Sequence, residues 1–295
     1  MFEGKNCKNL IQLDVNSNSL KAIPQSLFKL KKLEVLSLNH NQIVDLPLQD
    51  MDKAILPSIL RIGMEFNLLK RFPVEFIEQC TQLNELNLTN NEPLLDHPVP
   101  LDRLLASPLA KGSKSLLLRL DNRPRFIEQM QSEKWSEKAP WLTVDLQKIY
   151  PDKVLDFLYL GSVRTAQTVT VYHDLDIKYV LTVGRGLEVT LDPGMKHLVL
   201  PINDFPEENM SILFQEAFDF IDEARKEKKG ILIHCFAGLS RSVTIAAAYI
   251  MKNEKMTRDK AMDLIKQARP AARPNDGFMN ELLTFEKTLG LDKGQ

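Results

Sequence analysis

The sequence predicts an α/β protein in two parts: an N-terminal solenoid of short repeated strands, then a compact domain with a central, mostly parallel sheet flanked by helices. Two observations lead to this expectation. One apolar spacing recurs at offsets of 23, 26 and 24 residues through the first third of the chain, and short apolar runs alternate with helical patterns in the second half. A length of 295 residues suits about two domains.

The repeated spacing is L-x-x-L-x-L-x-x-N, with other apolar residues in place of some leucines. Its four copies begin at Leu10, Leu33, Ile59 and Leu83, their asparagines are Asn18, Asn41, Asn67 and Asn91, and three copies close on Ile23-Pro24, Leu46-Pro47 and Phe72-Pro73. One copy cannot bury its strand's apolar residues alone, so copies must stack into a shared core. The asparagine amide can satisfy backbone groups that turn away from the strand. These offsets match the leucine-rich repeat.

The alternate strand positions would form an outward, concave face of the repeats. They are Gln12, Asp14, Asn16, Val35, Ser37, Asn39, Arg61, Gly63, Glu65, Glu85, Asn87 and Thr89. This face is polar and mildly acidic, without the aromatic anchors that dominate tight interfaces. A face that binds a protein partner and a face that is only solvated both fit this composition.

The repeat pattern breaks where Glu92-Pro93 follows the fourth asparagine, and prolines punctuate residues 94–100. We therefore expect the repeats to occupy residues 1–100. Residues 101–140 mix short apolar runs with charge, which predicts a cap and connector. The second domain is expected over residues 141–295.

Four apolar runs in the second half predict buried strands, and four helical patterns lie between and after them. The strands are expected at 157–160, 179–183, 197–202 and 230–234, and the helices at 211–228, 242–253, 257–268 and 275–289. Thr257 and Asn275 are suitable N-cap residues for the last two helices.

Composition excludes several classes of protein. The net charge of -1 and the lack of a polybasic run argue against nucleic-acid and membrane-surface partners. Apolar stretches fall short of the roughly 18 residues of a bilayer helix, and residues 1–9 lack the apolar core of a signal peptide. Three scattered cysteines fit neither a disulfide framework nor a zinc site. We expect a soluble, reduced, cytoplasmic protein.

The residues from His234 to Ser242 carry the chemistry. A strand that breaks into a small-residue loop and enters a helix forms an anion cradle, because backbone N–H groups and the helix N-terminus face the same point. Cys235 is the strong nucleophile of this loop, and its thiolate is favoured in such an electropositive setting. Gly238 permits unusual backbone geometry, and the planar fork of Arg241 suits two phosphate oxygens.

Three other interpretations of this loop fit less well. A Walker A loop needs a Gly-Lys-Ser/Thr sequence, which this loop lacks. A cysteine protease needs a distant histidine as base, whereas His234 is the strand neighbour of Cys235 and should point to the opposite face. A merely structural cysteine does not explain the glycine and arginine that follow at this spacing. Phosphate chemistry is the function that the loop predicts.

The string His234-Cys235-Phe236-Ala237-Gly238-Leu239-Ser240-Arg241-Ser242 resembles the signature of the cysteine-dependent protein tyrosine phosphatases, specifically their dual-specificity branch. Further matches are the segments 159–162, Asn203-Asp204 and 273–278, so the resemblance covers roughly residues 141–289. Together with the repeats, the whole chain is similar to leucine-rich-repeat dual-specificity phosphatases.

This resemblance assigns a role to each site residue. Cys235 would form a phosphocysteine, Arg241 would stabilise the phosphoryl oxygens, and Asp204 would act as general acid and then as base. Glu207 and Glu208 lie near enough in sequence to compete with Asp204. The phosphate would be bound by Arg241 and by the loop residues Phe236, Ala237, Gly238, Leu239 and Ser240. Ser242 would donate a hydrogen bond to the sulfur, while His234 and Asn275 would support the loop.

The variable loop positions Phe236, Ala237 and Leu239 lack the lysines typical of phosphoinositide phosphatases. The resemblance thus implies phosphotyrosine, phosphoserine and phosphothreonine in proteins as substrates, in a signalling role. It implies no metal or other cofactor, because a side chain is the nucleophile. Two alternatives stay open: a scaffold that binds phosphorylated partners with little turnover, and a phosphoinositide phosphatase.

Overall fold

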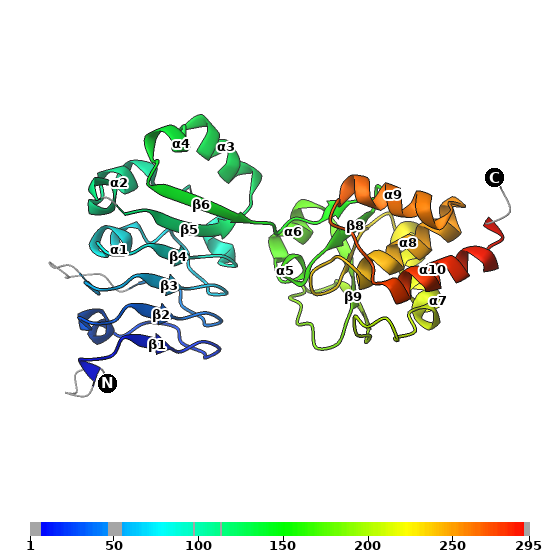
Figure 1. Cartoon of the computed structure of the whole chain (residues 1–295), viewed down its shortest axis with the longest axis horizontal. Helices are drawn as coiled ribbons and strands as arrows, with labels where there is room; N and C mark the ends of the chain where they lie inside the picture. The colour runs from blue at the N-terminus through cyan, green and yellow to red at the C-terminus, as the bar shows by residue number, and fades with distance from the viewer. Residues whose placement is uncertain (1–6, 47–54, 97, 113, 292–295) are drawn as a thin grey trace. The chain divides into compact units, whose positions relative to one another are not determined.

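A computed structural model describes residues 7–46, 55–96, 98–112 and 114–291 (Figure 1). Pro47, which closes the second expected repeat, and residues 1–6 of the segment considered for a signal peptide lie outside these ranges. The chain divides into two compact units, residues 1–148 and 149–295. Within the described ranges, no helix combines the length and the apolar character that a membrane span requires.

The first unit contains a six-stranded parallel sheet whose strands stack in chain order (Figure 1). The strands are β1 (Gln12–Asp14), β2 (Val35–Ser37), β3 (Arg61–Gly63), β4 (Glu85–Asn87), β5 (Leu116–Asp121) and β6 (Leu142–Gln147). The register from β1 to β4 follows the repeat. Leu13 pairs with Leu36, Leu36 with Ile62, and Ile62 with Leu86 on neighbouring strands. Equivalent residues of the four copies therefore lie side by side, as the sequence spacing requires.

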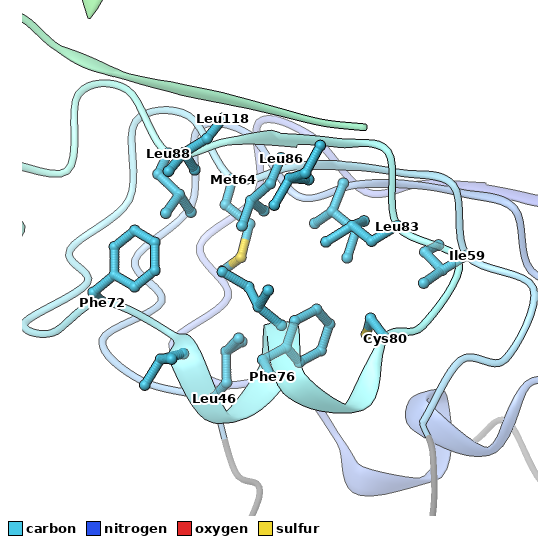
Figure 2. Close-up of a cluster of buried hydrophobic side chains, with 14 of the residues drawn as sticks. Leu46, Ile59, Met64, Phe72, Phe76, Cys80, Leu83, Leu86, Leu88 and Leu118 are labelled. Carbon is cyan, nitrogen blue, oxygen red and sulfur yellow. The ribbon is translucent and has the colours of Figure 1, made fainter. Parts of the chain in front are cut away.

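Short helices connect these strands. They are η2 (Gln25–Lys29), α1 (Val74–Gln79), η3 (Glu92–Asp96), α2 (Leu101–Ala106), η4 (Pro108–Lys111), α3 (Pro124–Ser132) and α4 (Trp135–Lys138). The apolar repeat residues fill one core, in which Phe76 of α1 lies among buried side chains of the strands, Leu86 and Leu118 among them (Figure 2). The last three copies are the best covered, since their leading apolar residues Leu33, Ile59 and Leu83 are fully buried.

The repeat asparagines bind the backbone as their fixed positions predict. The Nδ2 group of Asn67 donates to the carbonyls of Leu38 (2.9 Å), Met64 (3.1 Å) and Glu65 (3.3 Å), while its Oδ1 accepts from the N–H of Ile43 (3.0 Å). The same pattern holds for Asn41 and Asn91. Each of these side chains links two successive copies.

The sheet continues beyond the expected end of the repeats. Strand β5 pairs in parallel with β4, and β6 pairs in parallel with β5, although residues 101–140 were expected to form a cap and connector. Pro93 lies in η3 and Pro100 precedes α2, and the sheet continues after both. Residues 142–147, expected in the second domain, form β6 and so belong to the first unit.

One position of the expected outward face is in fact covered. Thr89 is 1% exposed, and its hydroxyl donates to Oδ1 of Asn87 at 2.8 Å. Thr89 is therefore not part of the exposed surface. The ion pairs of Arg119 with Glu85 (3.4 Å) and Asp145 (3.6 Å) extend the same row of polar side chains onto β5 and β6.

The second unit is built on a five-stranded sheet of order β10-β9-β11-β8-β7. Its strands are β7 (Asp152–Lys153), β8 (Leu158–Gly161), β9 (Ile177–Val183), β10 (Lys196–Leu200) and β11 (Gly230–His234). The pairs formed by β8, β9, β10 and β11 are parallel, and β7 alone among the described strands runs antiparallel to its neighbour. The four predicted strands and the predicted mostly parallel sheet are thus present.

Helices cover both faces of this sheet (Figure 1). They are α5 (Val163–Ala166), α6 (Val169–Asp174), η5 (Ser211–Leu213), α7 (Phe214–Lys226), α8 (Arg241–Glu254), α9 (Arg258–Ala268) and α10 (Asp276–Thr288). The two predicted N-caps are confirmed, because Oγ1 of Thr257 accepts from the Lys260 N–H and Oδ1 of Asn275 accepts from the Phe278 N–H. Since α8 begins where β11 has just ended, this strand–loop–helix unit positions the candidate site.

Candidate active site

The loop between β11 and α8 turns tightly around a glycine. Gly238 has a φ of +71°, and a Cβ at this position would lie 2.2 Å from the carbonyl oxygen of Gly161. Both the left-handed backbone and the close approach of the β8 end therefore require glycine here. The loop enters α8 at Arg241, so the N-terminus of a 14-residue helix opens onto it.

Cys235 lies at the base of this loop with only 1% of its surface exposed. Its sulfur accepts hydrogen bonds from the Gly238 N–H at 3.2 Å and from the Ser242 hydroxyl at 3.4 Å. Two donors directed at one sulfur stabilise its anionic form. The predicted contact between Ser242 and the sulfur is therefore present in the structure.

Cys80, by contrast, lies in the core of the first unit, where burial raises the pKa of its thiol far above the ordinary value. It is expected to remain protonated and unreactive. Among the cysteines that the structure describes, Cys235 is the one that lies in a loop between the end of a strand and the N-terminus of a helix.

Arg241 folds back beside the loop with 11% of its side chain exposed. Its Nη1 donates to the Ile202 carbonyl at 3.3 Å, and its Nε lies 3.5 Å from Oδ2 of Asp204. Within the described ranges, the buried Nε makes no hydrogen bond. A buried guanidinium N–H that is not used in a hydrogen bond is suited to an anionic ligand.

Asp204 is the carboxylate that contacts the loop. Its Oδ1 accepts from the Ser240 hydroxyl at 2.6 Å and from Nδ2 of Asn275 at 2.9 Å. Glu208 instead accepts from Nδ2 of Asn203 at 2.6 Å. The structure therefore brings Asp204, from a separate segment of the chain, to the loop that carries Cys235 and Arg241.

The supporting residues lie behind and beside the loop. His234 is fully buried, and its Nδ1 lies 3.3 Å from the Cys235 carbonyl oxygen. Leu232, two residues earlier and on the same face of β11, packs in a small apolar cluster with Val180. Cys235 packs in a separate, larger apolar cluster on the opposite face of the sheet. His234 thus faces away from the sulfur, as strand alternation predicts. Asn275 caps α10 while it holds Asp204.

The remaining loop residues differ in exposure. Phe236 is 65% exposed and Ala237 is also exposed, whereas Leu239 is half-buried and its carbonyl accepts from the Arg273 N–H at 2.7 Å. Phe205, next to Asp204, is 59% exposed. Two exposed aromatic residues therefore lie in the chain next to site residues, Phe205 after Asp204 and Phe236 after Cys235.

Arg269, which follows α9, was not predicted from the sequence. Its Nε donates to the Gly238 carbonyl at 2.6 Å and its Nη2 donates to the Ala237 carbonyl at 2.9 Å. Its Nη1 is held by Oδ2 of Asp152 at 2.6 Å. These bonds direct the loop carbonyls outward, which leaves the N–H groups on the inner side. No local signal could have revealed this contact, because Asp152 lies 117 residues earlier.

The arrangement can bind a small tetrahedral anion above a nucleophilic sulfur. The positive end of α8 and the guanidinium of Arg241 attract the anion, and Asp204 can exchange a proton at its edge. Within the described ranges, no cluster of three or more His, Cys, Asp or Glu side chains could hold a metal ion.

Comparison with known proteins places this site in a family. A model of the dual specificity phosphatase catalytic domain matches residues 158–288, and a leucine rich repeat model matches residues 5–54. Dual specificity protein phosphatase 1B of Arabidopsis thaliana is 39% identical over 132 residues, which are 45% of this chain and 79% of that protein. The chain therefore belongs to the dual specificity phosphatase family.

Other relatives share different lengths of the chain. Dual specificity protein phosphatase 6 of Rattus norvegicus is 34% identical over 224 residues, 75% of this chain. The chain spans 56% of the length of that rat protein. The crystal structure of human DUSP28 is 28% identical, with a TM-score of 0.46, and the match covers 48% of this chain and 95% of that one.

Proposed function

We propose that this chain is a protein phosphatase that hydrolyses phosphotyrosine, phosphoserine and phosphothreonine through a phosphocysteine intermediate. The observation that carries the proposal is the sulfur of Cys235, which accepts hydrogen bonds from Gly238 and Ser242 at the N-terminus of α8. This geometry supports a nucleophilic thiolate at the point where a phosphoryl group would be bound.

In the first step, Sγ of Cys235 attacks phosphorus and the bond from phosphorus to the leaving oxygen breaks. Arg241 and the loop amides stabilise the charge on the equatorial oxygens. Asp204 gives a proton to the leaving oxygen. Its Oδ1 accepts hydrogen bonds from Ser240 and Asn275, and its Oδ2, 3.5 Å from Nε of Arg241, is the oxygen that would carry that proton.

In the second step, water attacks phosphorus, the bond from sulfur to phosphorus breaks, and Asp204 takes the proton from water. The Ser242 hydroxyl, 3.4 Å from the sulfur, stabilises the departing thiolate. Phosphate and the starting protonation state result, so that atoms and charges balance.

The first unit would form a leucine-rich-repeat solenoid that binds a protein partner on its concave face. The parallel order from β1 to β6 and the shared asparagine contacts support this architecture. We propose the division between the repeat domain and the catalytic domain at residues 148 and 149, where the two compact units separate.

Hydrolysis assays test the role of Asp204. Asp204→Asn should lower kcat/KM for an alkyl phosphate, such as a phosphoserine peptide, by about 10²-fold or more, because a poor leaving group needs a proton. The kcat/KM for an aryl phosphate with an acidic leaving group should fall much less, because kcat/KM reports the formation of the phosphocysteine and not its later breakdown. Glu207 is an exposed carboxylate three residues after Asp204, so Glu207→Gln is the matched control and should leave both rates unchanged. Equal losses of kcat/KM on the two substrates would refute the general-acid role.

A comparison of substrates separates the alternatives. The parent chain should release phosphate from phosphopeptides faster than from phosphoinositides, and Cys235→Ser should abolish the release. No turnover by the parent would favour a binding scaffold, and preferential release from phosphoinositides would favour a lipid phosphatase.

A further inference from the structure

A threonine hydroxyl bridges two histidines behind the cysteine loop. Oγ1 of Thr182 in β9 lies 2.7 Å from Nε2 of His234 and 2.8 Å from Nε2 of His197 in β10. The same His234 ring places its Nδ1 3.3 Å from the carbonyl oxygen of Cys235. A chain of four polar groups therefore runs from a partly exposed strand to the backbone of the nucleophile.

Strand register brings these groups together. Thr182 pairs with His234 across β9 and β11, and it pairs with Val199, two residues after His197, across β9 and β10. All three polar side chains therefore lie on one face of the sheet. Thr182 and His234 are fully buried, so their hydrogen-bonding groups depend on one another for partners.

The hydrogen bonds determine which ring nitrogen carries each proton. Burial lowers the pKa of His234 to about 4. The hydrogen bond to the Cys235 backbone opposes this shift, whereas the charges of His197 and Arg241 add to it. The ring is therefore neutral at pH 7. A carbonyl oxygen can only accept, so the single proton of His234 lies on Nδ1. Its Nε2 must then accept from the Thr182 hydroxyl.

The same reasoning extends to the third side chain. The hydroxyl of Thr182 has one hydrogen, which is directed to His234. Its oxygen must therefore accept from His197, which places a proton on Nε2 of His197. Burial also lowers the pKa of His197, so at pH 7 this ring is neutral and carries that one proton.

We propose that Thr182 and His197 are positioning residues that fix the tautomer of His234 and, through it, the orientation of the Cys235 carbonyl. In a planar trans peptide the C=O and the following N–H point in opposite directions. A fixed Cys235 carbonyl therefore fixes the direction of the Phe236 N–H, the first amide after the nucleophile. The catalytic consequence rests on the proposed function, whereas the tautomers do not.

Selective ¹⁵N labelling of histidine and NMR at pH 7 test the proposal in the full-length chain without substrate. His234 should carry its proton on Nδ1 and His197 on Nε2. A proton on Nε2 of His234, or on Nδ1 of His197, would overturn the proposal. This readout does not depend on phosphatase activity, so it separates this inference from the proposed function.

Two substitutions then test the coupling to the loop. Thr182→Val removes the hydroxyl at nearly constant shape and should give His234 a mixture of tautomers. The rate of Cys235 alkylation by iodoacetamide at pH 7 should fall about threefold, because the loop amides lose a fixed orientation. Thr182→Ser retains the hydroxyl and should restore both the tautomer and the alkylation rate.

A folded Thr182→Val chain with an unchanged His234 tautomer and an unchanged alkylation rate would overturn the coupling. Should Thr182→Val fail to fold, the spectra of the parent and of Thr182→Ser decide, since both must show the Nδ1 proton on His234. If the parent chain shows the expected His234 and His197 tautomers but releases no phosphate, the result would count against the proposed function alone.

Discussion

The buried imidazole of His234 makes the second unit sensitive to acid. Burial, chiefly, lowers the pKa of His234 from an ordinary value of 6.5 to about 4. Between these two values the unfolded chain binds a proton that the folded chain does not. The contribution of His234 to stability is therefore complete above pH 6.5 and is lost as the pH falls toward 4.

From pH 7 to pH 5, this residue should cost the folded state on the order of 2 kcal/mol. His234→Gln does not titrate in this range, so its stability should fall less over the same interval. Hydrogen exchange of the buried amides of β11, corrected for intrinsic exchange at each pH, measures both free energies of unfolding. An equal decrease in parent and variant would contradict the assignment to His234.

At the residue scale, the sequence predicts the groups that lie within one short motif but not their distant partners. Cys235, Arg241 and Ser242 are close in sequence, and the strand–loop–helix context brings them to one point. Arg269 and Asp152 could not be foreseen, because a side chain after a helix and another at the start of a sheet meet only in the folded chain.

At the element scale, the buried asparagines hold the repeats together. The Asn67 side chain satisfies two carbonyls in its own repeat and links to Leu38 and Ile43 of the copy before it. Asn18, at the first copy, is exposed, and within the residues that the structure describes it donates only inside its own copy, to Val15 and Asn16. The repeat asparagine is therefore buried between copies inside the array and exposed at the first copy.

Asn67→Ala should destabilise the first unit by about 3 kcal/mol, because several buried backbone groups lose their partners. Asn18→Ala, the matched control, should cost less than about 1 kcal/mol, since water can replace its contacts. Both tryptophans, Trp135 and Trp141, lie in this unit, so urea unfolding followed by tryptophan fluorescence reports its stability. Similar losses in the two variants would show that the buried contacts are not what joins the copies.

The sequence predicts elements well where apolar residues set a clear period. The four strands and four helices predicted in the second half have clear apolar runs or stripes, and the structure places them within a few residues of the expected bounds, whereas the short helices α5 and α6 were not predicted. Strands β5 and β6 were missed because their neighbours are rich in charge and proline, and because the half-buried β6 lacks a continuous apolar run. The two-residue β7 is too short to give any pattern.

At the scale of the whole molecule, each unit has its own core. One cluster of buried residues runs from Ile23 to Ala139, and the other two lie between Val154 and Leu282. No described core cluster contains residues of both units. Cores that share no residues are expected to fold independently.

A fragment of residues 149–295 should therefore fold and hydrolyse a small aryl phosphate with a kcat/KM within about threefold of that of the full chain. Circular dichroism and steady-state kinetics on the two proteins check this. A folded fragment that has lost most of its activity would show that the repeats contribute to the chemical step, which is the opposite of what the separate cores predict.

The most direct test of the nucleophile is to trap the phosphoryl group on the protein. Asp204→Asn should form the intermediate from an aryl phosphate but break it down slowly, since the base that activates water is lost. Rapid acid quench and mass spectrometry should then find one phosphoryl group on the peptide containing Cys235, and none after the further change Cys235→Ser. A phosphoryl group on another residue, or continued phosphate release by the Cys235→Ser chain, would contradict the assignment of Cys235 as the nucleophile.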